Sequence, residues 1–187
     1  MKSNVFIIHG AYGNPEENWF PWLKERLEKL NFEVFVPKFP TPINQTLEKW
    51  LGVFEKYEKY LNKDSIVIGH SLGAAFLLNL LELRKIKAAF FVAGVGGKVE
   101  NEFWEGMKTF AWKKFNWYKI KNNCRSFSIY HSDNDPYIPL SHAEMLARNL
   151  STSVSIIKNA GHLNEESGYK KFELLLDDIK KIASKHL

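Results

Sequence analysis

The segment Gly69-His70-Ser71-Leu72-Gly73 has the pattern G-x-S-x-G. A serine in this pattern can act as a nucleophile when it stands on a sharp turn between a strand and a helix. The turn requires small residues two positions before and after the serine, and both are glycine here. A β-rich apolar run at 65–68 precedes the pattern, and an apolar helical segment at 72–83 follows it. This context favours a nucleophilic Ser71 over a glycine-containing turn whose serine takes no part in chemistry.

A serine hydroxyl is a poor nucleophile until a base removes its proton, and histidine is a suitable base. With a G-x-S-x-G nucleophile, the order along the chain is serine, then an acid, then histidine. His162 stands at the end of Asn159-Ala160-Gly161-His162, directly after the apolar run 154–157. A residue there would lie at the carboxyl edge of a parallel sheet, as Ser71 would. We therefore predict that His162 is the base.

Four histidines follow the serine in the chain, namely His131, His142, His162 and His186. His131 ends the apolar run 127–130 and is the alternative base. His142 falls in a helical pattern and is expected on the surface, and His186 is one residue from the end of the chain. His9 precedes the serine, and we expect it to pack within its own loop rather than act as a base.

The acid that orients the base should follow the fifth apolar run and precede His162. The segment Ser132-Asp133-Asn134-Asp135-Pro136 offers two carboxylates. Asp135 precedes a proline, which biases its backbone towards an extended conformation. Asp133 occupies a position where an aspartate commonly closes a turn. We predict Asp135 as the acid and keep Asp133 as the alternative.

Acyl transfer also needs two backbone N–H groups that stabilise the negative charge on the carbonyl oxygen. One should belong to Leu72, the residue after the nucleophile. The other should come from His9-Gly10-Ala11-Tyr12-Gly13, the loop after the first apolar run, and we predict Ala11 as this donor. Tyr12 is predicted to add its side chain to the substrate-binding residues.

The pattern of apolar residues along the chain predicts the strands and helices that position these residues. Six short apolar runs alternate with helical patterns, and the runs lie at 5–8, 33–36, 65–68, 88–93, 127–130 and 154–157. They are continuously apolar, which is typical of parallel strands buried on both faces of a sheet. Strand–helix repetition with right-handed crossovers predicts a three-layer α/β fold. The length of 187 residues predicts one domain over 1–187.

One long segment, 94–121, interrupts the alternation with 28 residues that carry no strand signal. We predict a short cap-like insertion over about 95–121. Its aromatic residues include Trp104, Trp112 and Trp117. These rings would either line an apolar acyl pocket or only pack the cap onto the sheet, and the sequence favours neither. Lysines between them would also allow contact with an anionic surface.

Composition narrows the classes of function. A single cysteine, Cys124, excludes a fold held by internal disulfides. The net charge of +5 is spread along the chain, which favours a solvated surface over nucleic-acid binding. We expect a cytoplasmic protein without a transmembrane segment, because no apolar run approaches the ~20 residues that span a bilayer and no signal peptide is recognisable. Nucleotide and metal motifs are absent from the sequence, so no cofactor and no metal are expected.

These residues make the chain similar to the α/β-hydrolases, and more narrowly to the small serine hydrolases related to retinoblastoma-binding protein nine. The resemblance covers nearly the whole length. It rests on His9-Gly10, on the G-x-S-x-G segment, on 132–136 and on Gly161-His162-Leu163-Asn164. It implies a Ser71–Asp135–His162 triad and six parallel strands in the order 2-1-3-4-5-6. The chain has no L-x-C-x-E motif, so a retinoblastoma-type partner is not expected.

The resemblance and the residues together predict a serine hydrolase that cleaves a small-molecule ester or amide through an acyl-enzyme on Ser71. A thioesterase or a C–C hydrolase could use the same residues. From another class of function, the alternative is a non-catalytic binding module on the same scaffold, because a fold alone does not determine function. The sequence carries no signal for an oligomeric state.

Overall fold

A computed structural model describes residues 3–100 and 102–184 of the chain. Within this part, the strands form one parallel sheet of six in the order β2-β1-β3-β4-β5-β6. The strands are β1 (Asn4–Ile8), β2 (Glu33–Phe35), β3 (Ile66–His70), β4 (Ile86–Val92), β5 (Cys124–Ser132) and β6 (Val154–Ile157). The predicted fold class and strand order are therefore confirmed.

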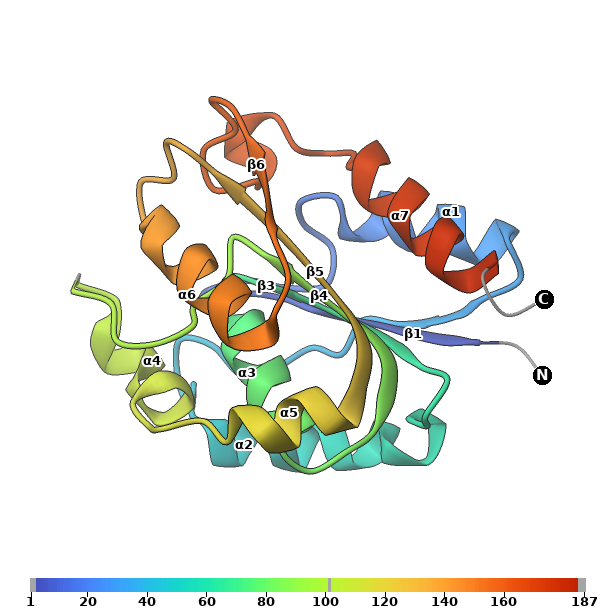
Figure 1. The fold of residues 1–187 in the computed structure, drawn as a ribbon, viewed down its shortest axis with the longest axis horizontal. Helices are drawn as coiled ribbons and strands as arrows, with labels where there is room; N and C mark the ends of the chain where they lie inside the picture. Colours follow the sequence, from blue (N-terminus) through green and yellow to red (C-terminus); the bar gives the residue numbers. More distant parts are fainter. Residues whose placement is uncertain (1–2, 101, 185–187) are drawn as a thin grey trace.

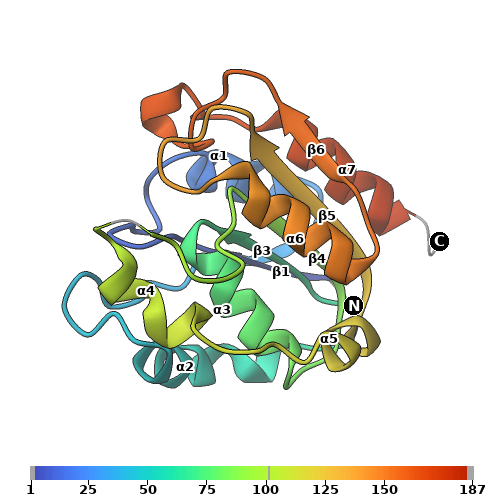
Figure 2. The same ribbon diagram turned by 60° about the vertical axis from the view of Figure 1, so that its left-hand side comes forward.

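Helices cover both faces of this sheet (Figure 1). One face carries α1 (Phe20–Lys29) and α7 (Glu173–Ser184). The other carries α2 (Leu47–Phe54), α3 (Leu72–Leu81), α4 (Trp104–Ala111), α5 (Trp117–Asn123) and α6 (Leu140–Leu150). The rotated view in Figure 2 keeps α1 and α7 apart from the other helices. Two short 3-10 helices, η1 (Glu55–Tyr60) and η2 (Glu165–Ser167), complete the described elements.

The hydrophobic core is divided by the sheet, because neighbouring residues of a strand point to opposite faces. In β1, Phe6 and Ile8 pack with the cluster that contains α2 and α3, whereas Val5 and Ile7 pack with α1 and α7. All four side chains are fully buried. Burial on both faces explains why the strands are continuously apolar in sequence.

Strand β5 begins at Cys124, three residues before the apolar run predicted at 127. Cys124 pairs with Ile86, and Ser126 pairs with Ala88, in the register of β4. The extension was missed because these first residues are polar or small and give no hydrophobic signal.

The predicted insertion contains two helices, α4 and α5, of which α5 continues to Asn123. That 1–187 form one domain with a cap over 95–121 stays a prediction, and His186 lies outside the described residues. Across 3–100 and 102–184, no helix has the length and apolar character needed to cross a bilayer.

Candidate active site

Ser71 forms the single-residue turn between β3 and α3. Its φ of 53° and ψ of −117° are a combination that residues other than glycine rarely adopt, and such strain costs of order 1–3 kcal/mol. The Ser71 N–H donates to the carbonyl of Val92 over 2.9 Å, and the Ser71 carbonyl accepts from the N–H of Val95 over 3.1 Å. Strand β4 and the residues after it therefore hold the turn in its strained form.

The glycines around the serine are sterically required. A Cβ atom on Gly69 would lie 2.5 Å from the carbonyl oxygen of Gly73, and one on Gly73 would lie 2.7 Å from the carbonyl oxygen of His9. Both contacts involve backbone atoms, which have little room to move. A Cβ atom on Gly10 would lie 2.9 Å from the Cβ of Ser71. The loop after β1 is thus packed directly against the candidate nucleophile.

Asp135 and His162 are in direct contact. The Nδ1–H of His162 donates to Oδ2 of Asp135 over 2.8 Å, while Oδ1 accepts from the N–H groups of Tyr137 and Ile138 over 2.9 and 3.0 Å. Burial disfavours the charged carboxylate, but the hydrogen bond and charge of His162, together with the two amides, outweigh it and lower the pKa of Asp135. The carboxylate therefore fixes the ring of His162 and leaves its Nε2 available as an acceptor.

Asp133, the alternative acid, makes a different contact. Its Oδ1 accepts from the N–H of Asn159 over 2.8 Å. The side-chain oxygen of Asn134 likewise accepts from the N–H of Gly161 over 2.8 Å. Both contacts tie the loop before His162 to the loop after β5, so Asp133 supports the backbone rather than the imidazole.

The alternative base, His131, is fully buried and does not line the cavity described below. Its Nε2–H donates to the carbonyl of Ile138 over 2.8 Å, and Nε2 lies 3.7 Å from Oδ2 of Asp135. Burial lowers the pKa of His131 and keeps the ring neutral. His142 is half-buried on α6, where its Nδ1 accepts from the N–H of Gly96 over 3.3 Å.

His9 is buried inside its own loop. The N–H of Phe39 donates to Nε2 of His9 over 3.0 Å, so the ring hydrogen is on Nδ1 and is donated to the carbonyl of Gly10 over 2.8 Å. The ring also packs against Trp50, with centroids 5.3 Å apart. Both ring nitrogens are thus engaged with the backbone, which gives His9 a structural role.

A cavity of about 570 Å³ brings the candidate residues together. Ser71 and His162 both line it, as does the loop segment Gly10-Ala11-Tyr12. Ser71 and His162 share this wall without a direct hydrogen bond between them. In enzymes without bound substrate such contacts are often long and tighten when substrate binds.

The backbone N–H groups of Ala11, on the cavity wall, and of Leu72, the residue after Ser71, have no acceptor among the described residues. The N–H of Tyr12, by contrast, donates to Oγ1 of Thr41 over 2.7 Å and to Oε1 of Gln45 over 3.3 Å. Leu72 begins α3, where unpaired N–H groups and the helix dipole favour a negative charge. That Ala11 and Leu72 are the oxyanion donors stays a prediction.

The predicted substrate-binding residues divide into two groups. Tyr12 lies on the cavity wall, whereas Trp104, Trp112 and Trp117 do not. The Trp112 side chain is 70% exposed and its ring contacts that of Trp104, with centroids 6.1 Å apart. Trp117 packs on Phe115 with centroids 5.6 Å apart. Trp104 and Trp117 thus pack against the core, whereas Trp112 is mostly exposed to solvent.

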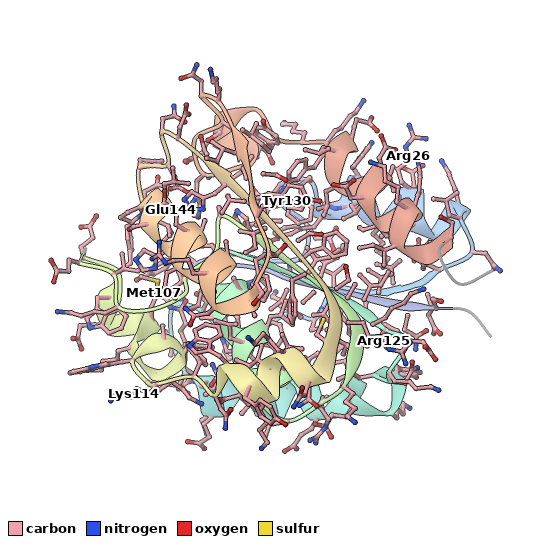
Figure 3. All side chains as sticks on the ribbon, in the orientation of Figure 1. Arg26, Met107, Lys114, Arg125, Tyr130 and Glu144 are labelled. Carbon is pink, nitrogen blue, oxygen red and sulfur yellow. The ribbon has the colours of Figure 1, made fainter. Side chains whose placement is uncertain are left out.

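The cap reaches the cavity through Phe103 and Met107, which were not singled out in the sequence. Met107 is labelled on α4 in Figure 3. The rings of Tyr12, Phe103, Tyr137 and His162 form a continuous series, with successive centroids 5.6, 5.9 and 5.1 Å apart. The spacing of Phe103, Met107 and Phe110 at i, i+4 and i+7 marks one helix face and could have identified this wall.

The rest of the cavity wall is polar and includes Glu17, Asn18, Asn164, Glu165 and Glu166. Partial burial and the nearby charge of Glu165 raise the pKa of Glu17, against the effect of its hydrogen bonds with Asn14 and Asn18. No three His, Cys, Asp or Glu side chains in the described part of the chain are grouped as metal ligands. The arrangement has the parts that acyl transfer requires, namely a hydroxyl, an oriented imidazole and two free N–H groups.

Similar proteins are known both in sequence and in structure. The chain is 27% identical over 194 residues to YdeN of Bacillus subtilis (strain 168), which covers 99% of this chain and 98% of that protein. It is 28% identical over 165 residues to serine hydrolase RBBP9 of Rattus norvegicus, with 86% and 87% covered. The crystal structure of the ydeN gene product from B. subtilis matches with a TM-score of 0.91 at 25% identity, over 98% of this chain and 100% of that one.

More distant structures share the fold. Est1E from Butyrivibrio proteoclasticus matches with a TM-score of 0.71 at 18% identity, over 97% of this chain and 87% of that one. Residues 5–181, from the second residue of β1 into α7, match the sequence model of the family described as serine hydrolase. The chain therefore belongs to the serine hydrolase family and has the α/β-hydrolase fold.

Proposed function

We propose that this chain hydrolyses a small-molecule ester or amide by acyl transfer, with Ser71 as nucleophile, His162 as base and Asp135 as the acid that orients it. The observation that carries the proposal is the 2.8 Å contact between Asp135 and His162, beside a cavity that His162 shares with Ser71. The strained turn at Ser71 supports the same assignment, because such strain is concentrated at functional sites.

In the first half of the reaction, Oγ of Ser71 attacks the carbonyl carbon while Nε2 of His162 takes the hydroxyl proton. The carbonyl π electrons move to oxygen, where the N–H groups of Ala11 and Leu72 stabilise the charge. The intermediate then collapses and the bond to the leaving group breaks. The leaving alcohol or amine takes the proton from His162, and the acyl group stays on Ser71 as an ester.

In the second half, a water molecule repeats the attack on the acyl-enzyme. His162 takes a proton from the water and returns it to Oγ of Ser71 as the acid product leaves. Asp135 stabilises the imidazolium in both halves because its carboxylate remains hydrogen-bonded to Nδ1. No net change of redox state occurs, and water is the only co-reactant.

The size and lining of the cavity favour a small substrate with an apolar part. Its volume of about 570 Å³ lies in the range of small-molecule sites, roughly 300–1,000 Å³. Phe103, Met107 and Tyr137 supply apolar surface on its wall. An acyl group in contact with these side chains would be held next to Ser71.

The proposal is tested with p-nitrophenyl esters, matched thioesters and aminoacyl amides as substrates. A burst of p-nitrophenol, stoichiometric with enzyme and followed by slower turnover, is the expected sign of an acyl-enzyme. The Ser71→Ala variant should lose the burst and lower kcat by several orders of magnitude. A variant as active as the parent would overturn the proposal. A folded parent that hydrolyses no substrate of the panel would favour a binding module instead.

A further inference from the structure

We propose that His70 is a positioning residue that fixes the backbone of His162, and that Trp19 supports it. This inference rests on the proposed function, because it assigns His162 as the base. His70 is the variable residue before the serine in G-x-S-x-G, and the reaction above gives it no role. We infer a role for His70 from its contacts and not from its place in the motif.

His70 reaches across the site to the loop of the base. Its Nε2 lies 3.0 Å from the carbonyl oxygen of His162. A carbonyl only accepts, so His70 carries its hydrogen on Nε2 and donates it. His70 is the last residue of β3, and His162 stands in the loop after β6. The bond therefore links the strand that presents the nucleophile to the loop that presents the base.

Trp19 makes the same kind of contact one residue further along. Its indole N–H donates to the carbonyl oxygen of Leu163 over 3.0 Å, and the side chain is fully buried. The rings of Trp19 and His70 meet edge to face, with centroids 6.1 Å apart. Leu163 has a φ of 51°, a conformation that persists only where its surroundings enforce it. Two buried donors thus hold two consecutive carbonyl groups of this loop.

The contacts hold every polar group of the His162 backbone and fix the ring as well. The N–H of His162 donates to Oγ of Ser167 over 3.2 Å, its carbonyl accepts from His70, and its Nδ1–H donates to Asp135. Without the bond from His70, the peptide after His162 is held only through its N–H group, which Leu163 donates to the carbonyl of Ala160 over 3.0 Å. The Nε2 atom of His162 would then be held less firmly in its position relative to Ser71.

His70 can donate at this place without acquiring a charge. The residue is buried, and its Nδ1 has no partner among the described residues. Burial, and secondarily the nearby charge of His162, lower the pKa of His70 to about 3. The other charged or titratable groups acting on it are Asp135 and His9. Because the rings of His70 and His162 are 4.9 Å apart, a charged His70 would oppose the imidazolium that the reaction forms.

The test compares two substitutions at position 70. His70→Gln keeps an N–H donor near the place of Nε2, whereas His70→Phe keeps a ring but no donor. We expect the Gln variant to retain more than about a fifth of the parent kcat. The Phe variant should lose about 10- to 100-fold in kcat with little change in KM, because a displaced base costs rate rather than binding. If His70 only fills space, the order is reversed, and that result would overturn the inference.

Substitutions of two tryptophans complete the test. Trp19→Phe removes the neighbouring donor and should lower kcat in the same direction, and it replaces His70→Phe if that variant does not fold. Trp22→Phe is the matched control, because the Trp22 indole nitrogen has no partner in the described part of the chain. It should leave the rate unchanged. A Trp19→Phe variant as active as this control would contradict the role of Trp19.

A second readout keeps this inference separate from the proposed function. The proton on Nδ1 of His162, hydrogen-bonded to Asp135, is observed by NMR as a downfield resonance and does not depend on turnover. It should stay sharp in His70→Gln and broaden or vanish in His70→Phe. If Ser71→Ala retains full activity, the proposed function fails, but this resonance still reports whether His70 positions His162. An unchanged resonance in His70→Phe would overturn the inference.

Discussion

Oδ2 of Asp135 lies 2.8 Å from Nδ1 of His162, although the residues follow two different strands, β5 and β6. These strands are parallel neighbours in the sheet, so the loops after them leave from the same edge. Ser71 leaves from that edge as well, at the end of β3. The parallel pairing of the strands thus brings together residues that are distant in the chain.

Asp135→Asn should lower kcat by up to about 10⁴-fold, because an amide no longer fixes the imidazole tautomer or stabilises its charge. Asp133→Asn is the matched control. Its side-chain oxygen can still accept from Asn159, so the loss should be small. Steady-state kinetics on an activated ester give both values. A larger loss at position 133 would reverse the assignment of the acid.

Ser71→Gly should unfold at a higher temperature than Ser71→Ala. Both variants lack Oγ, but only glycine relieves the strain of a φ of 53°. We expect the free energy of unfolding to differ by about 1 kcal/mol, which is the lower part of the usual range for such strain. In a chain of this size that is roughly 2–4 °C in Tm. Equal melting temperatures would show that the turn is not strained.

Phe103→Ala should change the acyl-chain preference, because Phe103 lines the cavity. One methylene in an apolar pocket contributes about 1–3 kcal/mol, so the preference should shift about tenfold or more. The measurement is kcat/KM for acetyl to octanoyl esters. Trp112→Ala, at a side chain that is 70% exposed, should leave the preference unchanged. If Phe103→Ala lowers all the esters by the same factor, Phe103 does not select the acyl chain.

His70 should make the protein less stable in acid. Its pKa is about 3 in the folded chain against 6.5 unfolded, so the unfolded chain binds the extra proton between these values. The contribution of His70 to the free energy of unfolding is therefore fully present above pH 6.5. It falls as the pH drops, by at most about 1.4 kcal/mol per pH unit. Between pH 7 and 4.5 the parent should lose about 2 kcal/mol more than His70→Gln in urea unfolding. Equal losses would mean that folding does not lower the pKa of His70.

The sheet could be predicted because its strands are buried on both faces. The run 5–8 is continuously apolar for that reason, and its residues are fully buried in β1. The strand order came with the resemblance to a known family. The start of β5 was missed, because Cys124 and Ser126 pair with β4 through backbone bonds that leave no hydrophobic signal.

The position of the candidate nucleophile was predictable because the turn excludes side chains at Gly69 and Gly73. The sequence could not predict which aromatic residues of the cap line the cavity, since a residue such as Trp112 looks the same in sequence whether it faces a cavity or the solvent. The contacts of His70 with His162 and of Trp19 with Leu163 join residues 92 and 144 positions apart. No local pattern encodes such pairs, because they form only when the loops are folded together.

That Ser71 is the nucleophile is tested most directly by intact-protein mass spectrometry after reaction with a fluorophosphonate. We predict one adduct per chain on the parent protein, located at Ser71 by peptide mapping. Ser71→Ala should stay unlabelled, and His162→Ala should react far more slowly than the parent because the base is missing. An adduct that persists on Ser71→Ala, or a folded parent that forms none, would contradict the assignment.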